Sequence, residues 1–373
     1  MKRMLPIGLP ILMSTLILSN LGAIDITGTA PVFGANQGSG LSQTQMDTFN
    51  AELGTTFNNA LNQIRDQIKD IDSKPEKVIR GFGNASVYAS TGATLRNYAG
   101  YKLFGVALGP MFGAQLPYSI FDILGNPDIG SDVMKKLKDE NDMAAGINAG
   151  LNLQFGLNMS FLVKNLYLGL KAGYFPGNAF LPDNMKFTTF SIGATVSYQF
   201  LPRRQLLPAN LLLWRGVSFN SGVIYQGTNM GIEMPLDKVT EGSSNFDLTI
   251  DPKVALNIDV HTVTIPLEAV TSIRLLWFLN LAVGLGVDVG FGSSNIEGSA
   301  TAEIKATSSN TQIRQDQAGS LSLSAGGKEG PSLFNPKLLL GLGLSIGPVL
   351  IDFPITFYLD NGYSIGVTLG VNF

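Results

Sequence analysis

Long runs in which apolar residues alternate with small or polar ones constrain this chain more than any other feature. In residues 147–161 every odd position is apolar, and every even position is Asn, Gly, Gln or Ser. A strand places alternate residues on opposite faces, whereas a helix would scatter them around its circumference. The same sorting recurs over residues 190–200, 279–291 and 363–373, so the chain is predicted to be mostly β-structure.

The length of these runs and the scarcity of charge favour strands that touch lipid. The apolar face persists for six to eight positions in each run. That length suits the roughly 9–11 residues of a tilted strand that crosses a bilayer, whereas soluble strands average about five or six. Only 14% of the residues are charged, against about a quarter in a typical soluble chain. A soluble β-sandwich is the alternative, but backbone groups inside hydrocarbon must all be paired, so a spanning sheet has to close.

We therefore predict an all-β, transmembrane, antiparallel up-and-down β-barrel of about ten strands over residues 101–373, with 12 or 14 strands as alternatives. The predicted strands are 101–116, 145–163, 166–175, 187–200, 211–225, 254–269, 278–292, 335–346, 349–359 and 363–373.

The connections between these strands support the count. The long ones, 117–144, 226–253 and 293–334, fall on one side, and the short ones, 164–165, 271–277 and 347–348, fall on the other. Outer-membrane barrels have this asymmetry. The Asn361-Gly362 step suits a primed hairpin turn. The polar runs 296–306 and 320–324 are expected to pair as a hairpin beyond the membrane.

The N-terminal hundred residues read differently. Residues 1–23 have the basic, apolar and small-residue regions of a cleaved signal peptide, with an uncleaved anchor as the alternative. Residues 24–100 form a helical segment and linker, with an amphipathic helix over 43–72 that ends before Pro75. This helix can lie in the periplasm, plug the lumen or self-associate. Residues 81–95 fit an extra strand, a lumenal segment or a linker.

Composition excludes several kinds of function. The chain has no cysteine, one histidine and a net charge of −3. These counts argue against thiolate or histidine metal sites and against a basic surface for nucleic acid. We expect no cofactor, no metal ion and no catalytic site.

The charged residues on the phase opposite to the apolar faces are the candidates for lining the lumen. They are Lys171, Arg215, Asp259, His261, Asp288, Lys337 and Asp352. Rings of charge can set ion preference in a pore. A ten-stranded barrel is also narrow enough for such residues to pair as structural salt bridges. The glycines on the same face favour open space.

Asp259 and His261 share one strand face, so a carboxylate could orient a histidine base there. This pair resembles half of the site of the omptin proteases, which are ten-stranded barrels. The Asp-x-Asp half has no counterpart on a neighbouring strand, and no His-Asp-Ser run of the outer-membrane phospholipase type occurs.

Residues 101–373, with the leader before them and the terminal Phe373, resemble the outer-membrane β-barrel proteins of diderm bacteria. In that family the last strand is read by the barrel-assembly machinery, which implies this role for Tyr363, Leu369 and Phe373. An N-terminal segment ahead of a barrel is similar to the long-chain fatty-acid transporters, whose N-terminus forms a lumenal hatch, although those barrels have more strands.

The resemblance implies an outer-membrane location and the lipid bilayer as a partner. It favours a channel or transporter for small or hydrophobic solutes, and not an enzyme. A structural or surface-interaction (adhesin-like) barrel without an open pore is the alternative, and an omptin-like hydrolase is the lesser one.

Overall fold

A computed structural model describes most of the chain, and its contacts group into two compact units. The described residues are 25–36, 40–69, 75–91, 103–116, 145–177, 181–208, 211–235, 239–242, 246–308 and 313–373. Unit 1 comprises Met1–Pro75, Gly231–Asn257 and Ile296–Gly327, and unit 2 comprises Glu76–Met230, Ile258–Asn295 and Lys328–Phe373. The predicted signal peptide and the connection 117–144 lie outside the described residues.

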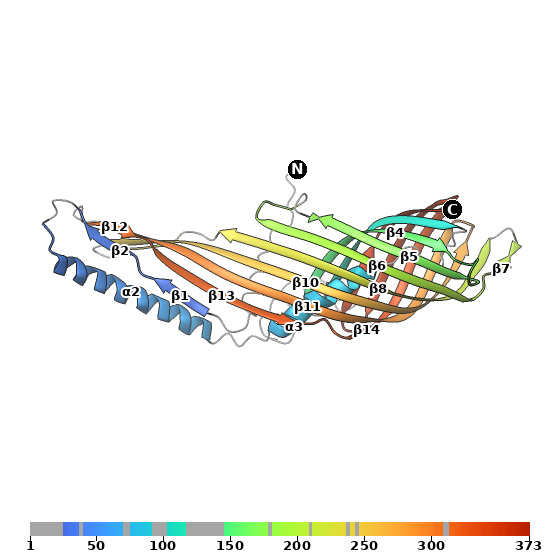
Figure 1. The fold of residues 1–373 in the computed structure, drawn as a ribbon, viewed down its shortest axis with the longest axis horizontal. Helices are drawn as coiled ribbons and strands as arrows, with labels where there is room; N and C mark the ends of the chain where they lie inside the picture. The colour runs from blue at the N-terminus through green and yellow to red at the C-terminus, as the bar shows by residue number, and fades with distance from the viewer. Residues whose placement is uncertain are drawn as a thin grey trace, which may run out of the picture. The chain divides into compact units, whose positions relative to one another are not determined.

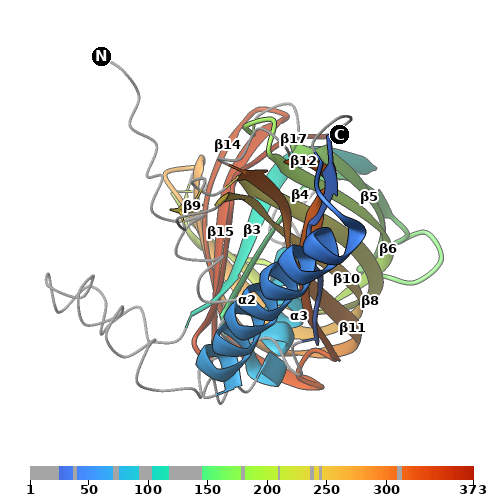
Figure 2. The same ribbon diagram turned by 90° about the vertical axis from the view of Figure 1, so that its left-hand side faces the viewer.

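Unit 2 contains a closed wall of ten antiparallel strands, so the predicted barrel and its strand count are confirmed. The wall strands are β3 (Phe104–Gln115), β4 (Gly146–Asn158), β5 (Leu166–Pro176), β6 (Met185–Leu201), β8 (Leu212–Pro235), β10 (Phe246–Leu275), β11 (Leu279–Ser308), β14 (Phe334–Ile346), β15 (Val349–Tyr358) and the last strand, recorded as β16 (Gly362–Gly366) and β17 (Thr368–Asn372). They pair in this order, and the last strand returns to β3 (Figures 1 and 2).

The break between β16 and β17 has a local cause. Both pieces keep one register along β3, because Gly366 faces Met111 and Leu369 faces Leu108. Pro110 lies opposite the break and has no N–H to donate to the ladder. One hydrogen bond survives there, from the N–H of Val367 to the carbonyl of Pro110 at 3.2 Å.

The wall is apolar outside and polar inside, the reverse of a soluble barrel. On β4, for example, the side chains of Leu153, Phe155 and Leu157 are exposed, while Asn152 and Gln154 are buried. Exposed large apolar residues recur at alternate positions on β3, β5, β6, β11, β14 and the last strand. An apolar surface on every side of a wall requires lipid around it. Within the membrane-spanning part of these strands, the alternation in the sequence therefore assigns the two faces correctly.

Three wall strands, β8, β10 and β11, have residues in both units, and the face that is apolar changes along them. The membrane half of β11, residues 279–291, exposes Leu285 and buries Asp288. The distal half of β11, residues 296–308, buries Ile296 and Ile304 and exposes Thr301. The phase does not slip, because the buried positions are even-numbered in both halves, although Gly292 between them is exposed. Since only the chemistry of the two faces is exchanged, the strand passes from lipid into water between residues 291 and 296.

This continuation corrects the predicted outer loops. Residues 226–253 are not a loop, because β8 extends to Pro235, β9 (Val239–Gly242) follows, and β10 begins at Phe246. Residues 293–334 hold the end of β11, β12 (Ile313–Gln317) and β13 (Gly319–Glu329). β13 pairs with β11, so the predicted hairpin is confirmed. The extension was not predicted because the apolar face of these segments consists largely of small residues, and their other face carries charged residues such as Glu303 and Lys305, so they lack the long apolar face of a membrane strand.

Unit 1 adds a small helix-on-strand layer to these extensions. β1 (Asp25–Thr29) pairs with β13, and β2 (Val32–Ala35) pairs with β12. The helix α2 (Gln43–Lys69) covers β2 through a cluster of Phe33, Met46 and Leu53. The predicted helix 43–72 is thus confirmed over its described part. Asn50 holds the edge of β2, because its amide exchanges two 2.9 Å hydrogen bonds with the backbone of Phe33.

The tight connections are set by residues in the left-handed region. Ile346 and Val349 pair across a two-residue turn, in which Gly347 has φ of 59°. The connection at 360–362 differs from the primed turn expected from its Asn-Gly step. Tyr358 pairs with Gly362, so three residues form the loop, and Asn361 has φ of 64°. A three-residue hairpin needs one left-handed residue at this place, and asparagine tolerates it.

Candidate functional site

The lumen of the barrel is occupied by a second helix, α3 (Pro75–Ser90). Every residue from Gly81 to Thr91 is buried, on all sides of the helix. The side chains of α3 contact β3, β10, β11, β14, β15 and the turn after β15, and its carbonyl groups reach β3 and β5. A helix can meet strands from all around a barrel only from inside it. Residues 81–95, which the sequence left open, therefore form a lumenal segment over their described part.

The wall glycines fit against this helix and do not leave a pore. A Cβ on Gly113 of β3 would lie 2.3 Å from the carbonyl oxygen of Ala85, and one on Gly146 of β4 would lie 2.3 Å from the backbone of Gly81. A Cβ on Gly362 would lie 2.3 Å from the ring of Tyr88. These approaches are too close for any side chain. The expectation that glycines on the inner face mean open space is wrong at these positions.

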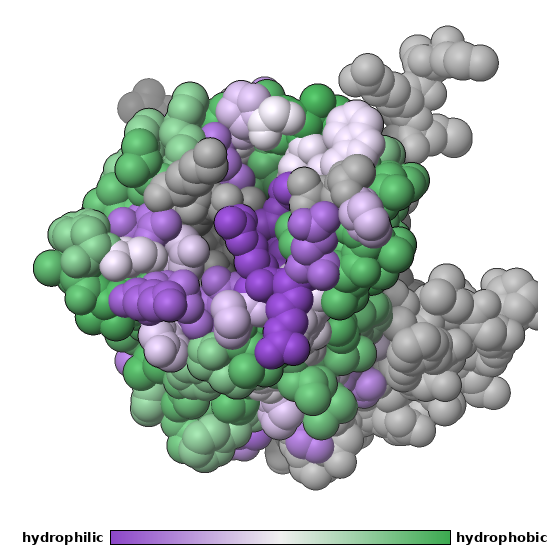
Figure 3. Space-filling view, turned by 90° about the vertical axis from the view of Figure 1, so that its right-hand side faces the viewer, coloured by the Kyte–Doolittle hydropathy of each residue, from purple (hydrophilic) through white to green (hydrophobic). Residues whose placement is uncertain are grey.

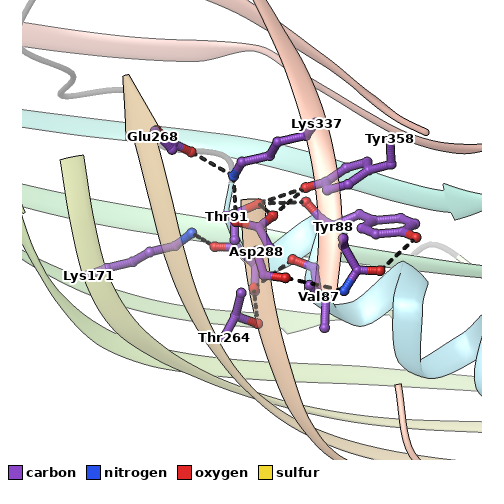
Figure 4. A network of polar contacts seen from close by, with 11 residues as sticks. Val87, Tyr88, Thr91, Lys171, Thr264, Glu268, Asp288, Lys337 and Tyr358 are labelled. Atoms are coloured by element: carbon purple, nitrogen blue, oxygen red, sulfur yellow. Dashed lines mark hydrogen bonds and ion pairs between the residues drawn. The ribbon is translucent and has the colours of Figure 1, made fainter. Parts of the chain in front are cut away.

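An ion-pair cluster lies where α3 ends (Figure 4). The ammonium group of Lys337 is 2.5 Å from Asp288 and 2.7 Å from Glu268, and all three side chains are almost completely buried. The Tyr358 hydroxyl donates to Asp288 at 2.8 Å. The Thr91 hydroxyl, just after α3, lies 3.3 Å from the same carboxylate. Buried charges must be paired and hydrogen-bonded, and Asp288 meets that requirement through both the wall and the helix.

Hydroxyl groups and one cation attach the helix to the wall. Ser86 lies 2.8 Å from Thr262, and Ser90 lies 3.0 Å from Thr264, hydroxyl to hydroxyl. Lys171 of β5 donates to the backbone carbonyl of Ser90. A helix C-terminus carries a partial negative charge that favours a cation, and α3 has no basic residue in its own last turn. The wall therefore supplies the cation that the helix sequence lacks.

Tyr88 joins the helix to the hairpin turn after β15. Its hydroxyl lies 2.8 Å from Gln115 and 3.0 Å from Asp360. Its ring stacks on that of Tyr358, with 3.7 Å between centroids. Burial and the charge of Asp360 raise the pKa of Tyr88, so the hydroxyl remains a donor. Burial raises the pKa of Asp360 above its usual value, and the hydrogen bond from Tyr88 opposes that shift.

The lumenal candidates separate into three groups. Lys171, Asp288, Lys337 and Asp352 are buried on the inward phase of their strands. Lys171, Asp288 and Lys337 meet around the end of α3. Asp352 lies opposite Gly343, away from that cluster, and has contacts of its own. Arg215 is half-buried near the short turns.

Asp259 and His261 do not face the lumen, so this part of the prediction is wrong. They lie on the exposed face of β10, and Ile258, Val260 and Thr262 fill the inward face. His261 is 3.2 Å from Asp259 through Nε2, and its Nδ1 is 2.8 Å from the Tyr225 hydroxyl. The prediction failed because the apolar residues of β10, like those of β11, change from one face of the strand to the other near this point. The lumenal carboxylate–histidine pair implied by the omptin resemblance is therefore not formed.

The signal for α3 in the sequence is weak. Pro75 marks the end of the predicted helix 43–72, but it is the first residue of α3, where proline is well tolerated. The small residues Ala85, Ser86, Ala89 and Ser90 are spaced by three and four. That spacing, together with the absence of charged residues after Arg80, indicates a helix that is enclosed on all sides over this part.

The assembly-signal candidates form the closing seam of the barrel. Phe373 stacks on Phe104 of β3 at 4.9 Å, and its N–H donates to the Phe104 carbonyl at 2.9 Å. Leu369 is exposed on the outer face, and Tyr363 packs edge-on against Phe357. None of the helices in the described part of the chain is both long and apolar enough to span a membrane.

Comparisons with solved structures return outer-membrane β-barrels. The translocator domain of the autotransporter NalP from Neisseria meningitidis is 6% identical, with a TM-score of 0.27, and the match covers 73% of this chain and 89% of that one. A FadL homologue from Pseudomonas aeruginosa is 10% identical, with a TM-score of 0.25, over 80% and 100% of the two chains. LpxR from Salmonella typhimurium is 11% identical, with a TM-score of 0.24, over 72% and 100%.

No curated protein sequence matches the chain significantly. A family model, described as Lsa36-like, matches residues 32–373, which include the described parts of β2, α2, α3 and the entire barrel wall. The chain is a member of the Lsa36-like family.

Proposed function

We propose that this protein is a gated channel or transporter of the bacterial outer membrane, closed in the described state by α3. The observation that carries the proposal is the form of the attachment between α3 and the wall. The helix is held by hydroxyl pairs, such as Ser86 with Thr262, and by one charged cluster around Asp288. Both are polar contacts that water can replace when the helix moves.

A plug with a purely structural role would be held more stably by apolar contacts than by polar ones. Net hydrogen bonds stabilise a fold by only about 0.5–1.5 kcal/mol each, because water competes for the same groups. A polar lumen with a polar helix can therefore rehydrate on opening at a modest cost. An apolar core would lose its full burial energy, about 25 cal/mol per Å². The polar lining supports a passage for small hydrophilic solutes once α3 is displaced.

Membrane insertion and location are part of the same proposal. The leader 1–23 directs export, and the barrel-assembly machinery reads the last strand through Tyr363, Leu369 and Phe373. The short turns then face the periplasm, as in outer-membrane barrels generally. Residues 24–74 and the distal halves of the long strands belong outside the lipid.

A disulfide between the helix and the wall tests the gate directly. The chain has no cysteine, so Ser86→Cys with Thr262→Cys introduces a single possible bond between two side chains that already touch. In liposomes, the reduced protein should admit small solutes and the oxidised protein should not, and reduction should restore entry. Each single cysteine variant is the matched control and should not respond to oxidation.

Two results would reject the gate. Equal solute entry in the oxidised and reduced double variant would show that α3 does not need to move. No entry in either state, with the barrel correctly folded, would indicate a sealed barrel.

A sealed barrel would favour a second candidate, a surface-interaction protein. The specific observation behind it is the length of β10 and β11, 30 residues each. About 9–11 residues suffice to cross a bilayer, so residues 246–257 of β10 and 296–308 of β11 are available to build unit 1 with β1, β2, β12, β13 and α2. Binding that survives the locked plug but is lost when exposed residues of unit 1 are changed would support this role.

A further inference from the structure

The short-turn end of the barrel, where β4–β5, β10–β11 and β14–β15 are joined, gathers three arginines from different elements. Arg203 follows β6, Arg215 lies near the start of β8, and Arg274 lies near the end of β10. Figure 3 views this end and shows strongly hydrophilic side chains in the middle, with hydrophobic surface around them. Arginine is rare in a membrane wall because it is costly there, so three at one mouth need an explanation.

The left-handed residue Gly216 interrupts the alternation of β8, as a β-bulge does, and turns Arg215 away from the lipid. Gly216 has φ of 79°, and further along β8 the odd positions, such as Phe219 and Val223, are exposed. Without a bulge Arg215 would share that lipid-facing side. Its Nε atom is instead completely enclosed, and it has no hydrogen-bond partner. Bulges commonly re-aim one side chain in this way.

Two neighbouring contacts hold this bulge in place. The Trp214 indole donates to the Thr271 hydroxyl at 2.8 Å, and that hydroxyl donates to the Gly216 carbonyl at 2.9 Å. The side-chain amide of Gln199 donates to the carbonyl of Arg215 at 2.5 Å. The position of Arg215 is therefore fixed by its backbone and not by a partner of its guanidinium group.

Arg274 is oriented by a fully buried asparagine. Its Nε lies 3.2 Å from the side-chain oxygen of Asn280, whose amide donates to the Ser345 hydroxyl at 2.8 Å. This contact uses one edge of the guanidinium and leaves the two Nη groups for another ligand. Arg215 and Arg274 lie on paired strands at this mouth, because the Thr271 hydroxyl donates to the Gly216 carbonyl and the Leu276 N–H donates to the Leu211 carbonyl, both at 2.9 Å. The charge of Arg203 also acts on Arg274.

Within the part of the chain that the structure describes, no carboxylate forms an ion pair with any of these three arginines. Lys337, deeper in the barrel, has two such partners. Like charges held close together without a counter-charge are unfavourable, and a bound anion removes that cost. Guanidinium groups match the geometry of phosphate and carboxylate oxygens.

We propose that Arg203, Arg215 and Arg274 form a binding site for a soluble oxyanion, with phosphate as its simplest representative, at the short-turn mouth of the barrel. The physiological role of this site rests on the proposed transport function. The site would select anionic solutes at the mouth of the barrel. The ligand is a soluble anion and not a lipid headgroup, because Arg215 and Arg274 lie on the inward side of their strands.

Binding can be measured whether or not the barrel conducts. The full chain, folded in zwitterionic detergent without anionic lipid, is titrated with inorganic phosphate against chloride at equal ionic strength, by calorimetry. We expect saturable binding that Arg215→Gln with Arg274→Gln weakens by about tenfold or more. Arg314→Gln is the matched control, because Arg314 is an exposed arginine of unit 1 that already pairs with Asp316, and it should leave the affinity unchanged.

Arg274→Lys distinguishes the contribution of charge from that of guanidinium geometry. Lysine keeps the positive charge but lacks the paired N–H donors, so this variant should weaken phosphate binding less than Arg274→Gln does. Heat-modifiable migration in gels shows that each variant is folded. Equal phosphate affinity in the wild type and the double variant would overturn the proposal, as would a non-saturable titration. Loss of phosphate binding with an intact disulfide-sensitive gate, or the reverse, would show which of the two proposals fails.

Discussion

The two halves of β11 bury opposite kinds of residue on the same side of the strand. In the membrane half the buried side carries Asn280 and Asp288, and the exposed side carries Leu285. In the distal half the buried side carries Ile296 and Ile304, and the exposed side carries Thr301 and other polar residues. The backbone is continuous through both, so the surrounding solvent alone decides which face is apolar.

Period-two alternation therefore predicts a strand but not the environment of its two faces. Alternation fixes two faces, and either can be the outer one. What identifies the membrane half is an exposed apolar face opposite a buried polar one. The same exchange occurs on β10, where the buried residues change from Val260 to Thr262.

The largest effect should come from the buried charge inside the membrane half. Lys337→Met removes the ammonium group that neutralises Asp288 and Glu268, and should lower the free energy of unfolding by about 3–5 kcal/mol. Lys305→Met, in the distal half of β11, removes an exposed partner of Glu303 and should change it by at most about 1 kcal/mol. Urea unfolding in lipid vesicles measures both.

Similar losses in the two variants would mean that the lumenal ion pair is solvated. A triple change that adds Asp288→Asn and Glu268→Gln to Lys337→Met should recover much of the stability, because no buried charge then lacks its counter-ion.

The exposed faces should respond to charge in opposite ways along one strand. Leu285→Arg places a guanidinium on the lipid side of the membrane half, where the leucine side chain is 66% exposed, and should cost about 2–4 kcal/mol. Thr301→Arg, at an exposed position in the distal half, should change stability by no more than about 0.5 kcal/mol. A tolerated arginine at 285, measured by the same unfolding assay, would place that surface in water.

Two inward-facing glycines of β4 test how closely α3 packs against the wall. Gly146→Ala would bring a Cβ to 2.3 Å from the backbone of α3, whereas a Cβ on Gly150 meets nothing closer than 3.5 Å. We expect Gly146→Ala to cost about 1–3 kcal/mol or to displace α3 and raise solute entry. Gly150→Ala should do neither. If both variants behave alike, α3 does not pack against β4.

The smallest effect should be a pH dependence at the turn after β15. The raised pKa of Asp360 means that the folded state holds this proton more firmly than the unfolded chain does. The stabilising contribution is therefore complete below the unfolded pKa of about 3.9 and is lost as the pH rises through the folded pKa. Wild type should lose stability relative to Asp360→Asn over that acidic interval only. A difference that stays constant with pH would contradict this assignment.

Much of the fold follows from the sequence because it is encoded locally. The ten strands and the helix α2 each carry a regular period that one segment reveals by itself. The placement of α3 depends on contacts between distant parts of the chain. Gly113, Gly146 and Gly362 lie far apart in the sequence and approach the helix only in the closed barrel.

The candidate site was predictable only in part, for the same reason. Lys171, Asp288 and Lys337 interrupt a polar inner face and are visible as rare charges. Tyr88, Thr91 and Tyr358, which complete their network, look like ordinary residues of a linker and a strand. Asp259 and His261 were misplaced because the alternation contains no sign of where the membrane ends.

The most direct test of the account is a scan of single cysteines along β11, each carrying a nitroxide, in the protein reconstituted into bilayers. Collision rates with oxygen, which concentrates in lipid, and with a water-soluble nickel chelate are compared at each position. We predict that odd positions from 279 to 291 favour oxygen, and that odd positions from 297 to 305 favour the nickel chelate. Preference for one reagent along the whole strand, without a crossover between 291 and 297, would contradict it.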